Sequence, residues 1–364
     1  MYCKIFTIVT LVFLTSCTVT TYPIPELDSK GDVYKTEGEN DHHIYDSTVG
    51  NKKCIMVYVD FPDAKAKGTS QERMKKVLGE GKFEEIFREQ SYAKVSFDIQ
   101  HVHGWRQLPL SHKKYSSKTT ESHREMFVEI FKLYPEINFL DYDYIMANVT
   151  RIGNTAFGER EAIAIPYKNT KIKVALNIVT ANPYVLAHET AHLMGLPDIY
   201  TYGGVDGPKN PAGPWDIMSS AYKATGFIGW HRHKLKWLDD DRKTYLTKGE
   251  HVIELSHLNS DSGISMIVVP SDDPQKPSKV FVVELAQALK LKGGKESKPE
   301  GVLVYSVDAT IVSGRNPLIV YPKVDLQKAQ YFPGDVFDHK DSPLKLTVLK
   351  KNGDLSYCVK VLVK

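Results

Sequence analysis

The 364-residue chain has no large excess of either charge, no dense cluster of basic residues and no internal repeat. It carries 47 Lys and Arg against 44 Asp and Glu, a net charge of +3. Surfaces that bind nucleic acid usually concentrate Lys and Arg in one region, so this composition argues against a nucleic-acid partner. The length and the hydrophobic content of 42% are typical of a globular protein, and two domains are the natural expectation.

Cysteine is scarce, with four residues at positions 3, 17, 54 and 358. Cys3 lies in residues 1–16, which we expect to be removed as a signal peptide. Cys17 is the first residue after that segment. Cys54 and Cys358 lie in apolar, strand-like stretches, where they either pair in an oxidising compartment or remain buried free thiols. Their spacing is not that of a metal site.

Long hydrophobic runs are also missing. The longest apolar run near the N-terminus covers residues 5–14, after Lys4. This run is too short to span a bilayer comfortably but is typical of a signal peptide, so we expect residues 1–16 to be removed. The segment Leu14-Thr15-Ser16-Cys17 resembles the lipobox of bacterial lipoproteins. The protein is therefore expected to be exported, and either anchored at the cell envelope through a lipidated Cys17 or secreted after an ordinary signal peptide.

Residues 17–50 are polar and show no apolar period, which predicts a tether or a short pro-segment. The pair His42-His43 lies in this stretch and is expected to be solvated rather than bound to a metal.

Residues 51–241 alternate between strand-like and helical patterns, which predicts an α/β domain. The expected strands cover residues 54–61, 95–102, 142–149 and 174–179, and the expected helices include residues 83–87 and 127–134. The run Val174 to Val179 is either an edge strand that pairs with an extended substrate or a purely structural strand.

Residues 242–364 consist of short apolar runs and predict a β-rich C-terminal domain, most simply a sandwich. The runs cover residues 264–269, 280–285, 301–307, 318–320, 344–349 and 355–363. Asn352-Gly353 lies between the last two and is a strong hairpin signal.

The motif that points to chemistry is His188-Glu189-Thr190-Ala191-His192. Two histidines four residues apart project from the same face of a helix and can bind one zinc ion. Glu189 lies beside them, where its carboxylate can take the proton from an attacking water whose pKa zinc lowers to about 7.

The residues around this motif predict where its helix begins and ends. Asn182-Pro183 supplies an N-cap and a proline at the first helical position. Gly195 can take the left-handed conformation that stops a helix and reverses the chain. Asp198 then becomes the candidate third ligand, and three protein ligands leave one position open for water.

The stretch His188 to Asp198 resembles the extended zinc signature of the metzincin metallopeptidases, in the variant with Asp in place of the third His. Pro214 to Ser220 resembles the Met-turn of that clan, with Met218 as the apolar floor of the metal site. The closest likeness is to the immune inhibitor A-like (M6) group of secreted bacterial proteases. It rests on residues 57–63, 92–95, 104–105, 195–200 and 226–237 and covers about residues 52–240. The resemblance implies a metzincin fold, a twisted, mostly parallel sheet with one antiparallel edge strand, and cleavage of proteins.

One departure concerns the third ligand. Gly213-Pro214 stands where members of the group often carry an acidic residue, so Asp216 is the alternative to Asp198. His231 and His233 are expected on the surface of a helix near the Met-turn. The Asp-, Gly- and Asn-rich stretch 197–210 admits either a Ca²⁺ site or a plain turn.

These features predict an exported zinc metalloendopeptidase that hydrolyses protein or peptide substrates, with Glu189 as general base and His188, His192 and Asp198 as metal ligands. The alternative is a catalytically idle binding or adhesion module of the same fold. The sequence determines neither the substrate nor the oligomeric state.

Overall fold

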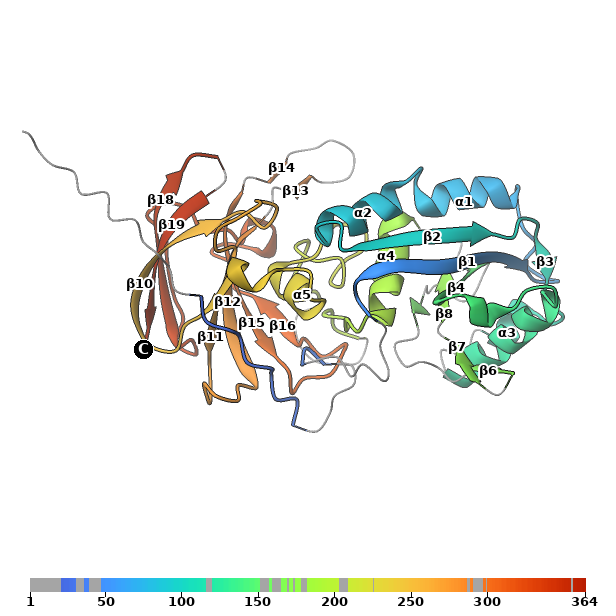
Figure 1. Cartoon of the computed structure of the whole chain (residues 1–364), viewed down its shortest axis with the longest axis horizontal. Helices are drawn as coiled ribbons and strands as arrows, with labels where there is room; N and C mark the ends of the chain where they lie inside the picture. Colours follow the sequence, from blue (N-terminus) through green and yellow to red (C-terminus); the bar gives the residue numbers. More distant parts are fainter. Residues whose placement is uncertain are drawn as a thin grey trace, which may run out of the picture.

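A computed structural model describes most of the chain. The described residues are 21–30, 36–38, 47–115, 120–150, 157–158, 165–168, 170–172, 174–177, 182–202, 209–224, 226–286, 289–290, 297–298, 300–354 and 356–364. The expected signal peptide, Cys17, the pair His42-His43 and the centre of the 197–210 stretch lie outside them. Figure 1 shows an α/β half and a β-rich half side by side along the long axis, with helix α5 (Gly229–Lys234) between them.

The α/β half is built on a mostly parallel six-stranded sheet of order β2-β1-β4-β8-β5, with β3 paired to the end of β1. Its strands are β1 (Gly50–Asp60), β2 (Val95–His101), β3 (Arg106–Gln107), β4 (Tyr144–Val149), β5 (Phe157–Gly158) and β8 (Val174–Asn177). Strand β5 runs antiparallel to β8 at the end of this order. Of the two alternatives for the run Val174 to Val179, its described residues fit the structural strand rather than the edge strand, because β8 lies between β4 and β5.

Helices cover both faces of this sheet because β1 is apolar on both sides. Cys54, Met56 and Tyr58 face one cluster with α1 (Ser70–Leu78), α2 (Lys82–Gln90) and α4 (Pro183–Leu193). Ile55 and the alternate residues after it face a second cluster with α3 (Thr120–Leu133). Short 3-10 helices cover His112–Tyr115 and Phe139–Asp141, and β6 (Ile165–Tyr167) pairs with β7 (Thr170–Ile172).

Two antiparallel-rich sheets form the β-rich half. One has the order β16-β15-β12-β11-β9 and the other β10-β19-β18-β17. The strands are β9 (Lys243–Tyr245), β10 (Gly249–Ser256), β11 (Met266–Pro270), β12 (Lys279–Ala286), β15 (Gly301–Asp308), β16 (Leu318–Val320), β17 (Val336–Asp338), β18 (Leu344–Asn352) and β19 (Ser356–Val363). A small hairpin joins β13 (Leu289–Lys290) to β14 (Ser297–Lys298), and 3-10 helices cover Asp240–Arg242 and Leu326–Lys328.

The sheet that contains β12 and β15 is buried on both faces. Val280 and Val282 belong to the cluster shared with α4, whereas Phe281 and Val283 face the second sheet. This alternation follows from the two-residue period of a strand. The two halves therefore share one continuous apolar core, and the predicted sandwich packs against the α/β half.

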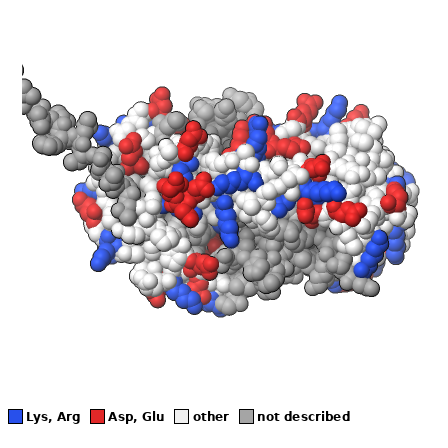
Figure 2. Space-filling view, viewed as in Figure 1, with Lys and Arg blue, Asp and Glu red and all other residues white. Residues whose placement is uncertain are grey.

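The described parts of the N-terminal segment pack onto this body. Leu27 is buried, and Asp28 donates its N–H to the carbonyl of Pro277 at 2.8 Å. Glu37 is buried against α5. On the face drawn in Figure 2, Lys and Arg alternate with Asp and Glu. Among the described residues, no helix has the length and hydrophobicity of a membrane span. Cys54 and Cys358 do not form a disulfide.

Candidate metal centre

Helix α4 begins and ends where the sequence predicts. The side chain of Asn182 accepts hydrogen bonds from the N–H groups of Tyr184 and Val185 at 3.0 and 3.3 Å, and Pro183 occupies the first turn. Beyond the helix, Gly195 has a φ of 101°, a conformation that favours glycine. The turn directs the following residues back across the end of the helix, towards the face that carries His188 and His192.

Both histidines are oriented by backbone carbonyls. The Nδ1–H of His188 donates to the carbonyl of Ile217 at 3.0 Å, and the Nδ1–H of His192 donates to that of Leu196 at 2.7 Å. Hydrogen bonds of this kind fix the tautomer in which Nε2 carries the lone pair. The Nε2 atoms of His188 and His192 are therefore the ring nitrogens that can bind a metal ion.

Asp198 meets these two nitrogens. Its Oδ1 lies 3.0 Å from Nε2 of His188 and 3.3 Å from Nε2 of His192, and all three side chains are buried. Burial alone would lower the pKa of His188, but its hydrogen bond to Asp198 and the charges of Glu189 and Asp198 together raise the pKa to about 9. A metal ion that binds here must displace that proton.

Glu189 lies against the same group. His188, Glu189 and His192 form a buried cluster whose ligand atoms all lie within 4.8 Å of one another. The imidazole nitrogens of His188 and His192 and the carboxylate oxygen of Asp198 are a donor set that zinc favours. The residues present therefore fit a metal ion, with Glu189 close enough to exchange a proton with a water beside it.

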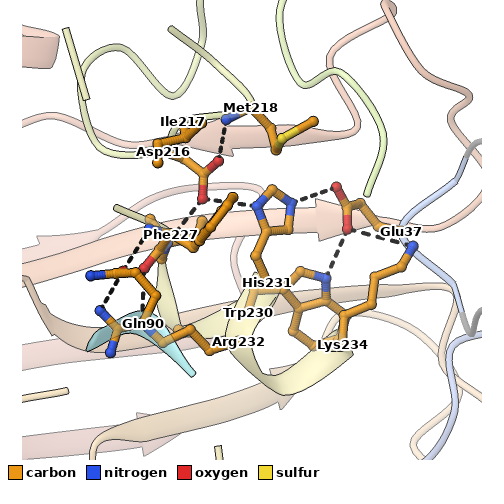
Figure 3. A network of polar contacts seen from close by, with 12 residues as sticks. Glu37, Gln90, Asp216, Ile217, Met218, Phe227, Trp230, His231, Arg232 and Lys234 are labelled. Atoms are coloured by element: carbon orange, nitrogen blue, oxygen red, sulfur yellow. Dashed lines mark hydrogen bonds and ion pairs between the residues drawn. The ribbon is translucent and has the colours of Figure 1, made fainter. Parts of the chain in front are cut away.

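The turn at Met218 lies against His188. Met218 is fully buried, and the residue before it supplies the carbonyl that orients His188. Asp216 shapes the turn: its Oδ1 accepts from the N–H of Met218 at 2.6 Å, and its Oδ2 accepts from the N–H of Ile228 at 2.9 Å and from Nδ1 of His231 at 2.8 Å (Figure 3). Both oxygens thus bind other groups, and Asp198 rather than Asp216 is the carboxylate that lies at Nε2 of the two histidines.

The expected surface position of His231 is wrong as well. His231 is fully buried between two carboxylates, with Nε2 3.0 Å from Oε1 of Glu37 and Nδ1 bound to Asp216 (Figure 3). Burial opposes the charged form, but the charges of Asp216 and Glu37 outweigh it and raise the pKa of His231 to about 10. His233 is half-buried, and burial lowers its pKa to about 3.

The β-rich half anchors the helix that carries His231. Oε2 of Glu284 accepts hydrogen bonds from the N–H of Gly229, at the start of α5, at 2.7 Å and from the hydroxyl of Tyr305 at 2.6 Å. Burial raises the pKa of Glu284 to about 7. Sequence reasoning did not identify Glu37 or Glu284 as buried partners of α5, because neither belongs to a local motif.

Asp198 is also held from outside the motif. Its Oδ2 accepts from the hydroxyl of Tyr202 at 2.5 Å, and its N–H donates to Oγ of Ser313 at 3.0 Å. Neither residue stands out in the sequence.

Comparison with known proteins adds little to this geometry. No protein-family model and no curated protein sequence matches the chain. Among solved structures, the chain is similar to catalytically inactive OgpA from Akkermansia muciniphila in complex with an O-glycopeptide, glycodrosocin. The identity is 9%, the match covers 81% of this chain and 90% of OgpA, and the TM-score is 0.29. A likeness of this size supports no statement about function.

Proposed function

We propose that this protein is a zinc-dependent endopeptidase of the metzincin type, exported and active on protein or peptide substrates. The observation that carries the proposal is the convergence of His188, His192 and Asp198 on one buried point, with Glu189 beside it. The burial of Met218, and the contact of the neighbouring Ile217 carbonyl with His188, support the likeness to a Met-turn.

His188, His192 and Asp198 would hold the metal ion through Nε2, Nε2 and Oδ1. A zinc ion held there would lower the pKa of a bound water to about 7 and would polarise the scissile carbonyl. Glu189 accepts the proton of the attacking water and passes it to the leaving amine. The carbonyls of Ile217 and Leu196 hold both imidazoles in one tautomer throughout.

Among the described residues, the antiparallel strand β5 lies at the edge of the sheet, next to β8, which precedes α4 in the sequence. An edge strand offers unpaired backbone groups that can pair with an extended peptide. We therefore assign to β5, rather than to β8, the role of aligning the substrate.

The decisive variant is Glu189→Gln, which keeps the size of the side chain and removes the base. We expect zinc binding to persist and cleavage of casein to fall by about 10²- to 10⁴-fold or more, the typical contribution of general acid–base catalysis. Glu250→Gln, an exposed position on β10, is the matched control and should cleave at the wild-type rate.

Unchanged proteolysis by Glu189→Gln would refute the assigned base. Wild-type protein that binds zinc yet leaves casein and other unfolded proteins intact, with or without a chelator, would instead favour the idle binding module.

A further inference from the structure

The turn formed by residues 313–316 in the β-rich half contacts the loop that carries the candidate metal ligand. The N–H of Gly314 donates to the carbonyl of Asp198 at 3.0 Å, and the N–H of Tyr202 donates to the carbonyl of Gly314 at 3.0 Å. Ser313 accepts from the N–H of Asp198. The backbone on both sides of the ligand is therefore bound to a segment more than a hundred residues away in sequence.

Tyr202 connects this turn to the carboxylate itself. Its hydroxyl lies 2.5 Å from Oδ2 of Asp198 and 3.2 Å from Oγ of Ser313. A carboxylate has two oxygens, and a donor bound to one of them determines where the other points. Here the hydroxyl binds Oδ2 while Oδ1 faces His188 and His192.

The ring of Tyr202 reaches this position because residue 314 has no side chain. Gly314 has a φ of 73°, which disfavours other residues, and a Cβ atom there would overlap Cγ, Cδ2 and Cε2 of the Tyr202 ring. Glycine at position 314 thus allows both the positive φ of the turn and the close approach of the Tyr202 ring.

We propose, on the basis of the metal site in the proposed function, that Tyr202 is a positioning residue for Asp198 and that the 313–316 turn holds it in place. The β-rich half is then part of the metal site. Outer-shell partners of this kind orient metal ligands, and their loss typically lowers metal affinity by about 10- to 100-fold.

The test is the affinity of the full chain for zinc, measured by competition with a chromogenic chelator in the Glu189→Gln background, which excludes self-cleavage. Tyr202→Phe removes only the hydroxyl and should weaken zinc binding by about 10- to 100-fold. Gly314→Ala should weaken it in the same direction by displacing the ring. Circular dichroism of the metal-free protein should show the same folded state for Tyr202→Phe and its background.

The β-rich half offers a matched control for Tyr202→Phe, a second pair of serine and tyrosine hydroxyls. Ser306 and Tyr321 form a Ser–Tyr hydroxyl pair at 3.2 Å, and Tyr321 packs against the core between the two sheets. Tyr321→Phe should leave zinc affinity unchanged.

Tyr202→Phe that binds zinc within twofold of its background would overturn the proposal. So would an equal loss in Tyr321→Phe, because the effect would then be a general weakening of the β-rich half. Since affinity rather than cleavage is measured, a zinc-binding protein without peptidase activity would refute the proposed function and leave the role of Tyr202 standing.

Discussion

The strongest prediction about stability concerns Glu37, which lies outside both predicted domains and is nevertheless fully buried. Its Oε1 lies 3.0 Å from Nε2 of His231, its Oε2 accepts from Nε1 of Trp230 at 3.2 Å, and Lys234 lies 4.0 Å away (Figure 3). Through His231 and Asp216 this carboxylate is connected to the turn beneath the metal site.

Replacing Glu37 by Gln removes the negative charge and keeps the shape. At 3.0 Å and an effective dielectric constant of about 20, the pair with His231 attracts by roughly 5 kcal/mol before desolvation is counted. Removal of one partner from a buried ion pair costs about 3–5 kcal/mol. His231 keeps Asp216 at 2.8 Å, so we expect the lower end, about 3 kcal/mol.

Urea unfolding measures this directly, as a lower midpoint at an unchanged slope. Glu26→Gln is the control, because Glu26 lies in the same N-terminal segment but is exposed, and it should change the free energy of unfolding by less than about 0.5 kcal/mol. If Glu37→Gln were as stable as Glu26→Gln, the buried ion pair would contribute nothing, and the reasoning would be refuted.

The pKa of His231 is about 10 in the folded state and about 6.5 in the unfolded state, so the stability that charged His231 contributes is complete below pH 6.5 and is lost as the pH rises to 10. The difference in unfolding free energy between wild type and His231→Asn should therefore narrow from pH 6.5 to pH 10. A difference that stays constant over this range would contradict the charged pair. Dialysis against a chelator should lower the thermal midpoint and added Zn²⁺ should restore it, since a ligand that binds only the folded state stabilises it; equal midpoints would argue against a bound metal. Mass spectrometry of the mature protein should find an N-terminus at a lipidated Cys17, and an unmodified N-terminus elsewhere would indicate an ordinary secreted protein.

The features that the sequence determined are local ones. The cap at Asn182, the glycine stop at Gly195 and the four-residue spacing of the histidines depend only on neighbouring residues, and the structure agrees with each. The predicted strands of both halves appear within a few residues of their expected bounds, and Asn352-Gly353 lies where β18 turns into β19. Propensity and hydrophobic period act over a few residues, so these elements could be predicted.

The features that only tertiary structure decided all join distant segments. Glu37 and His231 are 194 residues apart, and Asp198 and Ser313 are 115 apart. Asp216 carries the same carboxylate as Asp198, yet its oxygens bind Met218, Ile228 and His231. Long-range packing decides which carboxylate faces the histidines and which strand ends the sheet. No local pattern encodes the first choice, because the same side chain can serve as a ligand or as a buried hydrogen-bond acceptor.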